Sequence, residues 1–373
     1  MLSALSTANG RLPLRIGSSL LALAAAHAAT ASGQPRDPAT LASELMSRDR
    51  LPSLSIAIGR GGQLVHAEAF GLADVESSVP ASPKTVYRVG SVAKPITATA
   101  ILRLAEQGRL DLDRPIETYC PAFPSKPGTV TARHLLAHLG GIRDYDYGRF
   151  DEEFLSRKRY PTLADALTVF AGDPLTAAPG AKHSYSSFGY VLLGCAVEGA
   201  SGEPFGGHLE RSVLGPAGMR QTRPDVPEQI VPHRAATYSR APDGGWTNSP
   251  FVDLSDRVPA GGLLSTPSDL VAFGMALLDG SLISSETWSA MIEGRKTSAG
   301  ERVAYGAGWR LGEEAGEVFH GGTSVGGSAY LYVRSATGTV VAFATNVDRW
   351  TEPRHELALA LADWTESHRS ETP

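Results

Sequence analysis

The sequence predicts an α+β fold in which an antiparallel sheet is built from both ends of the chain and a mainly helical region is inserted between them. Two apolar segments at residues 54–58 and 63–69 flank Gly-Arg-Gly-Gly at 59–62, a pattern typical of a β-hairpin. Strand-like segments recur near the other end, whereas helical patterns and Pro/Gly loops dominate residues 91–300. This order favours one sheet that joins the two ends.

The elements near the C-terminus are justified in the same way. Short apolar or alternating segments at residues 318–321, 328–333 and 339–345 predict three strands. Leucines and a tryptophan at helical spacing predict an amphipathic helix over 352–366, and a similar pattern predicts a helix over 268–278. These strands would complete the sheet that the N-terminal hairpin begins.

Composition and charge indicate a folded globular protein and argue against a nucleic-acid-binding protein. The 373 residues are 42% hydrophobic and 20% charged, which is enough apolar sequence for a sizeable core. The net charge is -5 and the 34 Lys and Arg residues are scattered, so no nucleic-acid partner is expected.

The N-terminal part has the layout of a signal peptide over residues 1–31. Arg11 and Arg15 precede an apolar segment at 16–25, which is shorter than the about 20 residues that a membrane-spanning helix needs. We therefore expect a periplasmic or secreted protein without stable membrane insertion, and one folded domain over residues 40–368. A membrane anchor or a mitochondrial-type presequence is the alternative, because acidic residues are absent from this part of the chain.

Cysteine and histidine spacing give no metal site. Cys120 and Cys195 are the only cysteines, and we expect two unpaired thiols, although an oxidising compartment would allow one disulfide. His134 and His138 are four residues apart on an expected helix, but the Glu of the zinc-protease pattern does not follow His134. Both are expected to be structural histidines.

A candidate nucleophile and base lie at Ser91 and Lys94. Gly90 ends an extended stretch, and Ser91 opens a helix that stops at Gly108. Residues three apart on a helix lie on the same face, so an uncharged Lys94 amine could take the Ser91 hydroxyl proton. In addition, the positive end of the helix dipole at the N-terminus stabilises a developing oxyanion. The alternative is an ordinary N-cap serine followed by a solvated lysine.

Two further segments carry candidate site residues. Tyr185 lies between a Pro-Gly loop and a helix expected to begin at Val191, where its phenol could share a proton with Lys94 and pass it to a leaving group. His320 is followed by two glycines at a strand end, where a backbone amide could complete an oxyanion hole with that of Ser91. The alternatives are a packed loop tyrosine and a simple bulge or turn.

Together these segments resemble the motifs of the serine β-lactamase and penicillin-binding-protein superfamily. The three motifs are 91–94 (Ser-Val-Ala-Lys), 185–187 (Tyr-Ser-Ser) and 320–322 (His-Gly-Gly). The resemblance covers about residues 45–365 and is nearest to the class C β-lactamase-like group that contains the mitochondrial serine β-lactamase-like protein and its bacterial relatives. It rests there on 135–145, 173–175, 185–190 and 260–266.

The resemblance implies a β-lactamase/transpeptidase-like fold with flanking terminal helices, a site between the sheet and the helical region, and neither metal nor cofactor. It implies that Ser91 is acylated while Lys94 and Tyr185 exchange protons. The amide of Thr323, after His320 and Gly322, would join that of Ser91 in holding the oxyanion.

Two positions depart from the pattern of these relatives. Ser187 stands where many relatives have Asn, and His320 stands where β-lactamases commonly have Lys, so a fixed positive charge is missing unless the imidazole is protonated. We therefore expect a serine hydrolase of a small-molecule or peptide substrate, with a peptidase favoured. Esterase, β-lactamase and D-Ala-D-Ala carboxypeptidase activities are alternatives, as is a non-catalytic binding or scaffold protein with a degenerate site.

A second serine motif and two loop segments are also candidate parts of a site. Gly-Thr-Ser-Val-Gly at 322–326 matches a nucleophile elbow around Ser324, followed by Asp348 and His355 in the order of an α/β-hydrolase triad. The elbow requires a helix after the serine, but the next residues alternate as a strand does, so we reject it. Pocket walls are expected from residues 141–160 and 235–257, and the sequence predicts neither the substrate nor the oligomeric state.

Overall fold

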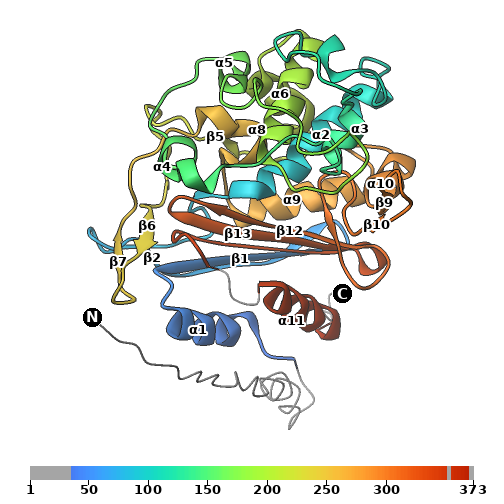
Figure 1. Cartoon of the computed structure of the whole chain (residues 1–373). Helices are drawn as coiled ribbons and strands as arrows, with labels where there is room; N and C mark the ends of the chain where they lie inside the picture. Colours follow the sequence, from blue (N-terminus) through green and yellow to red (C-terminus); the bar gives the residue numbers. More distant parts are fainter. Residues whose placement is uncertain (1–34, 351–353, 369–373) are drawn as a thin grey trace, which may run out of the picture. The chain divides into compact units, whose positions relative to one another are not determined.

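The computed structural model describes residues 35–350 and 354–368, and the expected signal peptide lies outside them. Their centre is a seven-stranded antiparallel sheet (Figure 1). Its order is β11 (Arg310–Leu311), β12 (Glu317–Ser324), β13 (Gly327–Arg334), β14 (Thr339–Thr345), β1 (Ser53–Arg60), β2 (Gln63–Asp74) and β3 (Val79–Pro80).

The pairing of β1 with β14 joins the two ends of the chain. Ile56 lies opposite Phe343 in this antiparallel pair, and β1 also forms the predicted hairpin with β2. The expected α+β fold, with one sheet made from both termini, is confirmed.

Both faces of the sheet are covered by helices (Figure 1). Along β14, Val341 and Phe343 face the core shared with α1 (Pro38–Asp49) and α11 (Arg354–Ser367), whereas Ala342 and Ala344 face the larger core of the helical region. Since side chains alternate along a strand, burial of both faces explains why this strand is a continuous apolar run.

The helical region holds the remaining long helices and several short strand pairs. Its helices are α2 (Ala93–Glu106), α3 (Ala132–Leu136), α4 (Phe150–Glu153), α5 (Leu163–Leu167), α6 (Ser187–Ser201), α7 (Phe205–Leu209), α8 (Val258–Gly261), α9 (Pro267–Leu278) and α10 (Ser285–Met291). The short strands are β4 (Tyr87–Arg88), β5 (Arg223–Pro224), β6 (Tyr238–Arg240), β7 (Trp246–Asn248), β8 (Leu263–Ser265), β9 (Arg295–Lys296) and β10 (Arg302–Val303).

A disulfide between Cys120 and Cys195 corrects the expectation of two unpaired thiols. The loop that carries Cys120 folds against α6, and the two Cα atoms come within 5.5 Å, a distance that a disulfide can span. Sequence spacing could not show this approach, because the partners are 75 residues apart. Closing a loop of that length stabilises a fold by about 4 kcal/mol in the chain-entropy account.

Within residues 35–350 and 354–368, no helix combines the length and the apolar character that crossing a membrane requires.

Candidate active site

Ser91 and Lys94 meet where an extended segment turns into α2. Gly90 adopts φ 50°, in the left-handed region that glycine tolerates, and a single 3-10 turn over Gly90–Val92 leads into the helix. Lys94 lies in the first turn of α2 and is 0% exposed. Its Nζ is 3.0 Å from Ser91 Oγ, so the structure brings the predicted pair into hydrogen-bond contact.

Lys94 also joins three elements of the helical region. Nζ donates to the carbonyl oxygen of Ala260 in α8 at 2.8 Å and to Ser187 Oγ in α6 at 3.3 Å. With Ser91 Oγ, these are three oxygen atoms within hydrogen-bond distance of Nζ. The Ser187 hydroxyl therefore reaches Lys94, although it is shorter than an asparagine amide. Sequence reasoning missed Ala260, because a backbone carbonyl has no residue signature.

Tyr185 lies against Lys94, just before α6. The Tyr185 ring centroid is 4.9 Å from Lys94 Nζ, and its hydroxyl has no hydrogen-bond partner among the described residues. The helix begins at Ser187 and not at Val191 as expected, because the Ser186 hydroxyl accepts the Gly189 amide and caps the helix one turn earlier. Because the Tyr185 hydroxyl has no partner among the described residues, it can form a hydrogen bond with a substrate.

His138 holds the segment that carries Tyr185. Its carbonyl oxygen accepts the Ser184 amide at 2.9 Å, and its Nδ1 accepts the Ser186 amide at 3.1 Å. Its ring lies 4.3 Å from that of Tyr185. Burial and the charge of Lys94 hold the pKa of His138 well below its ordinary value, so the imidazole is neutral and Nδ1 can accept. The sequence predicted a structural histidine but not this contact.

The backbone of β12 passes very close to that of Ser91. A Cβ added at Gly322 would lie 1.9 Å from the carbonyl oxygen of Val89 and 3.0 Å from the Ser91 amide nitrogen. A Cβ added at Gly90 would lie 2.6 Å from the Thr323 amide nitrogen. Only glycine fits at these two contacts, and the approach places the amides of Ser91 and Thr323 in one small region where an oxyanion could sit.

His320 is buried beside these groups and is neutral. Its Nδ1 lies 2.8 Å from the Gly321 carbonyl oxygen, which can only accept, so Nδ1 carries the proton and Nε2 accepts from the Tyr305 hydroxyl at 2.9 Å. Burial and the nearby charges of Lys94 and Arg310 hold the pKa of His320 well below its ordinary value. His320 therefore supplies no positive charge for a substrate carboxylate.

Among residues 35–350 and 354–368, neither Asp348 nor His355 is hydrogen-bonded to Ser324 as a triad would require. Ser324 ends β12, and the chain continues directly into β13 as an antiparallel hairpin and not into a helix. Asp348 accepts from Ser239, and His355 Nδ1 lies 2.9 Å from the Tyr330 hydroxyl. The strand geometry thus agrees with the rejection of the elbow.

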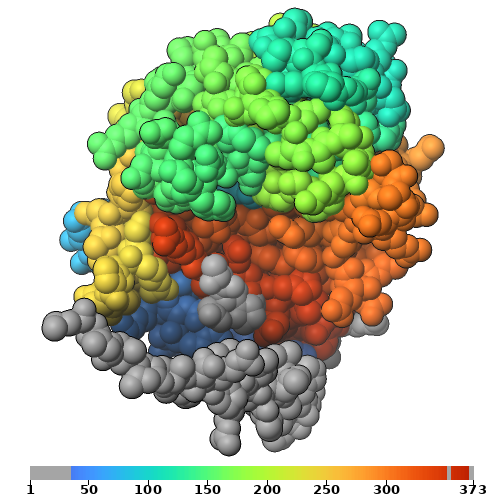
Figure 2. Space-filling view, viewed as in Figure 1, coloured from blue at the N-terminus to red at the C-terminus, as the bar shows by residue number. Residues whose placement is uncertain are grey.

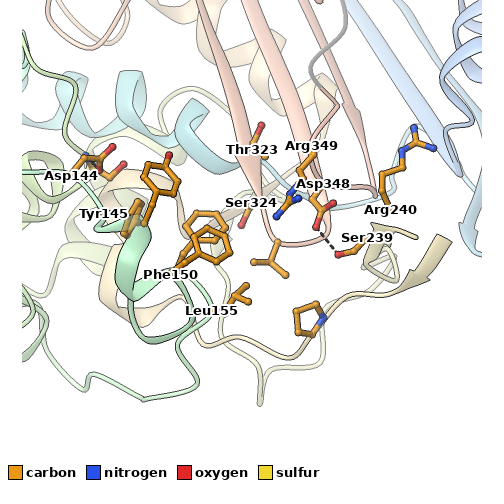
Figure 3. A pocket seen from close by; sticks show the side chains of 15 residues that line it. Asp144, Tyr145, Phe150, Leu155, Ser239, Arg240, Thr323, Ser324, Asp348 and Arg349 are labelled. Atoms are coloured by element: carbon orange, nitrogen blue, oxygen red, sulfur yellow. Dashed lines mark hydrogen bonds between the residues drawn. The ribbon is translucent and has the colours of Figure 1, made fainter. Parts of the chain in front are cut away.

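A pocket of about 720 Å³ opens beside Ser187 and Thr323. In the space-filling view, the green segment with α4 and the yellow segment with β6 and β7 lie around the red strand hairpin (Figure 2). Figure 3 shows Tyr145 and Phe150 on one side, with Ser239 and Arg349 on the other. Both segments expected as walls contribute, as do residues 323–325 and 348–349.

Among residues 35–350 and 354–368, no three His, Cys, Asp or Glu side chains are grouped so that they could hold a metal ion.

Residues 39–364 match the protein family described as Beta-lactamase. The chain is 30% identical over 294 residues to the human serine β-lactamase-like protein LACTB, mitochondrial, a match that covers 61% of this chain and 54% of that protein. It is 30% identical over 262 residues to the putative penicillin-binding protein PbpX of Bacillus subtilis, covering 68% and 60%. The chain thus spans little more than half the length of these relatives.

Solved structures share the fold. The octameric penicillin-binding protein homologue from Pyrococcus abyssi superposes with a TM-score of 0.73 at 29% identity, over 86% of this chain and 75% of that one. A D-stereospecific amidohydrolase from Streptomyces sp. gives a TM-score of 0.70 at 25% identity, over 86% and 97%. The family match, the shared fold and the motif order lead to one conclusion: this chain belongs to the Beta-lactamase family.

Proposed function

We propose that the protein hydrolyses an amide or ester bond through an acyl-enzyme on Ser91, and that a peptide is its favoured substrate. The observation that carries this proposal is the buried Lys94, whose Nζ lies 3.0 Å from Ser91 Oγ and 4.9 Å from the Tyr185 ring. A lysine with this burial and these neighbours suits proton transfer better than a solvated surface role.

The proposed acylation proceeds in two proton transfers. Lys94 in its amine form takes the Ser91 hydroxyl proton while Oγ attacks the substrate carbonyl carbon, and the amides of Ser91 and Thr323 bind the resulting oxyanion. Tyr185 relays the proton to the leaving amine or alcohol as the tetrahedral intermediate collapses to the acyl-serine ester. Water then attacks that ester with the same groups, which releases the acid and restores the Ser91 hydroxyl.

The neutral His320 favours a peptide or ester over a β-lactam. A β-lactam antibiotic carries a carboxylate next to its reactive amide, and the buried imidazole offers that carboxylate no positive charge. The likeness to a D-stereospecific amidohydrolase supports amide hydrolysis, and the penicillin-binding relatives keep cell-wall peptides as an alternative.

Turnover assays separate these possibilities. We expect the purified protein to hydrolyse a p-nitrophenyl ester and short peptides faster than the Ser91→Ala variant, by roughly 10⁴-fold or more for a lost nucleophile. Absence of turnover by the wild type would favour a binding or scaffold role. Release of D-Ala from a muropeptide would instead identify a carboxypeptidase.

We also propose that the chain is exported through its N-terminal segment. The Cys120–Cys195 disulfide supports this, because disulfides persist in oxidising compartments and are rare in the cytosol. Alkylation of the protein recovered from its host should modify both cysteines only after reduction, and its intact mass should lack the leader. Reactive thiols on an unprocessed chain would contradict export.

A further inference from the structure

The pocket extends from one side of the candidate reacting groups only. Ser187 and Thr323 line it, whereas Tyr185 and His320 are not among the described residues that do. Because Tyr185 protonates the leaving group in the proposed mechanism, the leaving group lies on the Tyr185 side of the scissile bond. The acyl substituent then extends the other way, past Thr323 and into the pocket.

One wall of this pocket is a row of aromatic side chains. Tyr147 stacks on Phe150 with ring centroids 6.2 Å apart, Phe150 stacks on Phe154 at 4.9 Å, and Phe154 meets Tyr145 edge-on at 5.3 Å. Tyr147 is 81% exposed at the solvent end, and the other three are partly exposed. A contiguous apolar row left open to water is typical of a binding surface.

Two members of the row, Tyr145 and Phe154, contact Arg257. The guanidinium of the buried Arg257 lies 5.1 Å from the Tyr145 ring and 5.3 Å from that of Phe154. Arg257 also donates to the backbone carbonyl oxygens of Glu153 and Phe154, and the Glu153 side chain pairs with Arg143 at 3.0 Å. Because these contacts fix Tyr145 and Phe154, the two rings need little ordering when a ligand binds, and their apolar area is available for affinity.

Polar side chains lie across the pocket from the aromatic row (Figure 3), although the lining also includes the apolar Pro250 and Val325. Asp348 accepts a hydrogen bond from Ser239 at 2.6 Å, and Arg240 donates to the carbonyl oxygen of Arg50 at 2.9 Å. Arg349 is exposed at the same wall. A ligand that fits both walls has an apolar side chain on one side and a polar chain, such as a peptide backbone, on the other.

We propose that this pocket makes the protein selective for substrates whose acyl group carries a bulky apolar side chain of aromatic size, bound against Phe150 and Phe154. This selectivity rests on acylation of Ser91 as proposed above. The volume of about 720 Å³ lies within the range of roughly 300–1,000 Å³ that small-molecule sites occupy, and so admits such a group together with a stretch of backbone.

The test varies the acyl group of p-nitrophenyl esters while the leaving group stays the same. We expect kcat/KM for the phenylacetate to exceed that for the acetate by about 10- to 100-fold, the gain from burying one ring. The Phe150→Ala and Phe154→Ala variants should each lower this ratio several-fold. The Phe251→Ala variant is the matched control, because Phe251 is 59% exposed and lines a different cavity, and its ratio should stay at the wild-type value.

Two outcomes would overturn the selectivity. One is a wild-type ratio near one, and the other is a ratio that Phe150→Ala leaves intact. If Phe150→Ala does not fold, Tyr147→Ala at the exposed end of the row provides the same comparison with an ester of N-acyl phenylalanine. Labelling of Ser91 by a small fluorophosphonate distinguishes failure of the selectivity from failure of the proposed function. Labelling without selectivity overturns this inference alone, and no labelling overturns the proposed function with it.

Discussion

The two ends of the active site are built in opposite ways. At the nucleophile end, Lys94, Ser187 and His320 are buried, and their polar groups are hydrogen-bonded to neighbouring elements. At the pocket end, Tyr147 is largely exposed, and Phe150, the first residue of α4, is partly exposed. Buried groups in a closed network tolerate few substitutions, whereas an open apolar wall can be exchanged without disturbing the fold.

This difference predicts that the proposed chemistry and the proposed selectivity are separable. Substitutions at the nucleophile end should lower turnover for every substrate, and those at the pocket end should change which substrate is preferred. The predictions that follow alter the nucleophile end, in order of decreasing effect, and ask whether the pocket end remains intact.

Removing the Lys94 amine should have the largest effect. Lys94→Met keeps the length of the buried side chain but removes the partner of Ser91, Ser187 and Ala260, so kcat should fall by about 10²- to 10⁴-fold, the usual range for a lost proton-transfer group. The ratio between phenylacetate and acetate esters, measured by steady-state kinetics, should persist in any residual activity.

Lys126→Met is the matched control for this variant. Lys126 also donates to two backbone carbonyl oxygens, those of Ala171 and Asp173, but it lies in a loop of the helical region. Its kcat should stay near that of the wild type. Equal losses in both variants would show that the effect is general destabilisation and would break the comparison.

Adding a methyl group at Gly322 should have the next largest effect. Because a Cβ there would lie 1.9 Å from the Val89 carbonyl oxygen, Gly322→Ala must push β12 away from Ser91 and separate the two oxyanion donors. We expect kcat to fall by about 100- to 1000-fold, as for the loss of one such donor. Gly172→Ala, at an exposed glycine with no atom within 4 Å of the added Cβ, should change nothing.

Removing the contact by which His138 positions Tyr185 should lower kcat by a smaller factor than the two changes above. His138→Leu removes the acceptor of the Ser186 amide, so kcat should drop by about 10- to 100-fold while KM stays unchanged, because the pocket does not include His138. His138→Asn should recover much of this loss, since its amide oxygen can accept the same N–H and asparagine tolerates the φ of 58°. Failure of Asn to improve on Leu would contradict a positioning role.

The pH dependence of stability should show the smallest effect. His138 and His320 have pKa values well below that of a histidine in the unfolded chain, about 6.5, because burial disfavours their charged forms. Below that pH the unfolded chain binds more protons than the folded one. The free energy of unfolding should therefore decrease on acidification, by about 1.4 kcal/mol per pH unit for each histidine.

Urea denaturation at about pH 7.5 and about pH 5.5 measures this loss. The His138→Asn variant should lose less stability than the wild type between the two values, because it lacks one of the two buried imidazoles. A denaturation midpoint that rises on acidification would show that these histidines are protonated in the folded protein.

The fold and the contact between Ser91 and Lys94 could be predicted because their signals are local. The Gly-rich turn between β1 and β2 and the helical spacing of Ser91 and Lys94 each lie within a few residues, where backbone geometry follows from composition. Gly322 is a related case, since a glycine at a strand end indicates close backbone approach.

The remaining features depend on contacts between distant segments. The Ala260 carbonyl that binds Lys94, the hold of His138 on Tyr185 and the Cys120–Cys195 bond each join residues that only the tertiary fold brings together. The pocket was assigned to the correct segments, but its aromatic row depends on how the chain around α4 packs on Arg257. Periodicity carries no information on such packing.

Intact mass after incubation with a fluorophosphonate tests the central claim most directly. The probe should form one phosphonyl adduct, with loss of fluoride, on the wild type and on Ser324→Ala, and none on Ser91→Ala. An adduct that persists in Ser91→Ala but disappears in Ser324→Ala would contradict the assignment of Ser91 as the nucleophile.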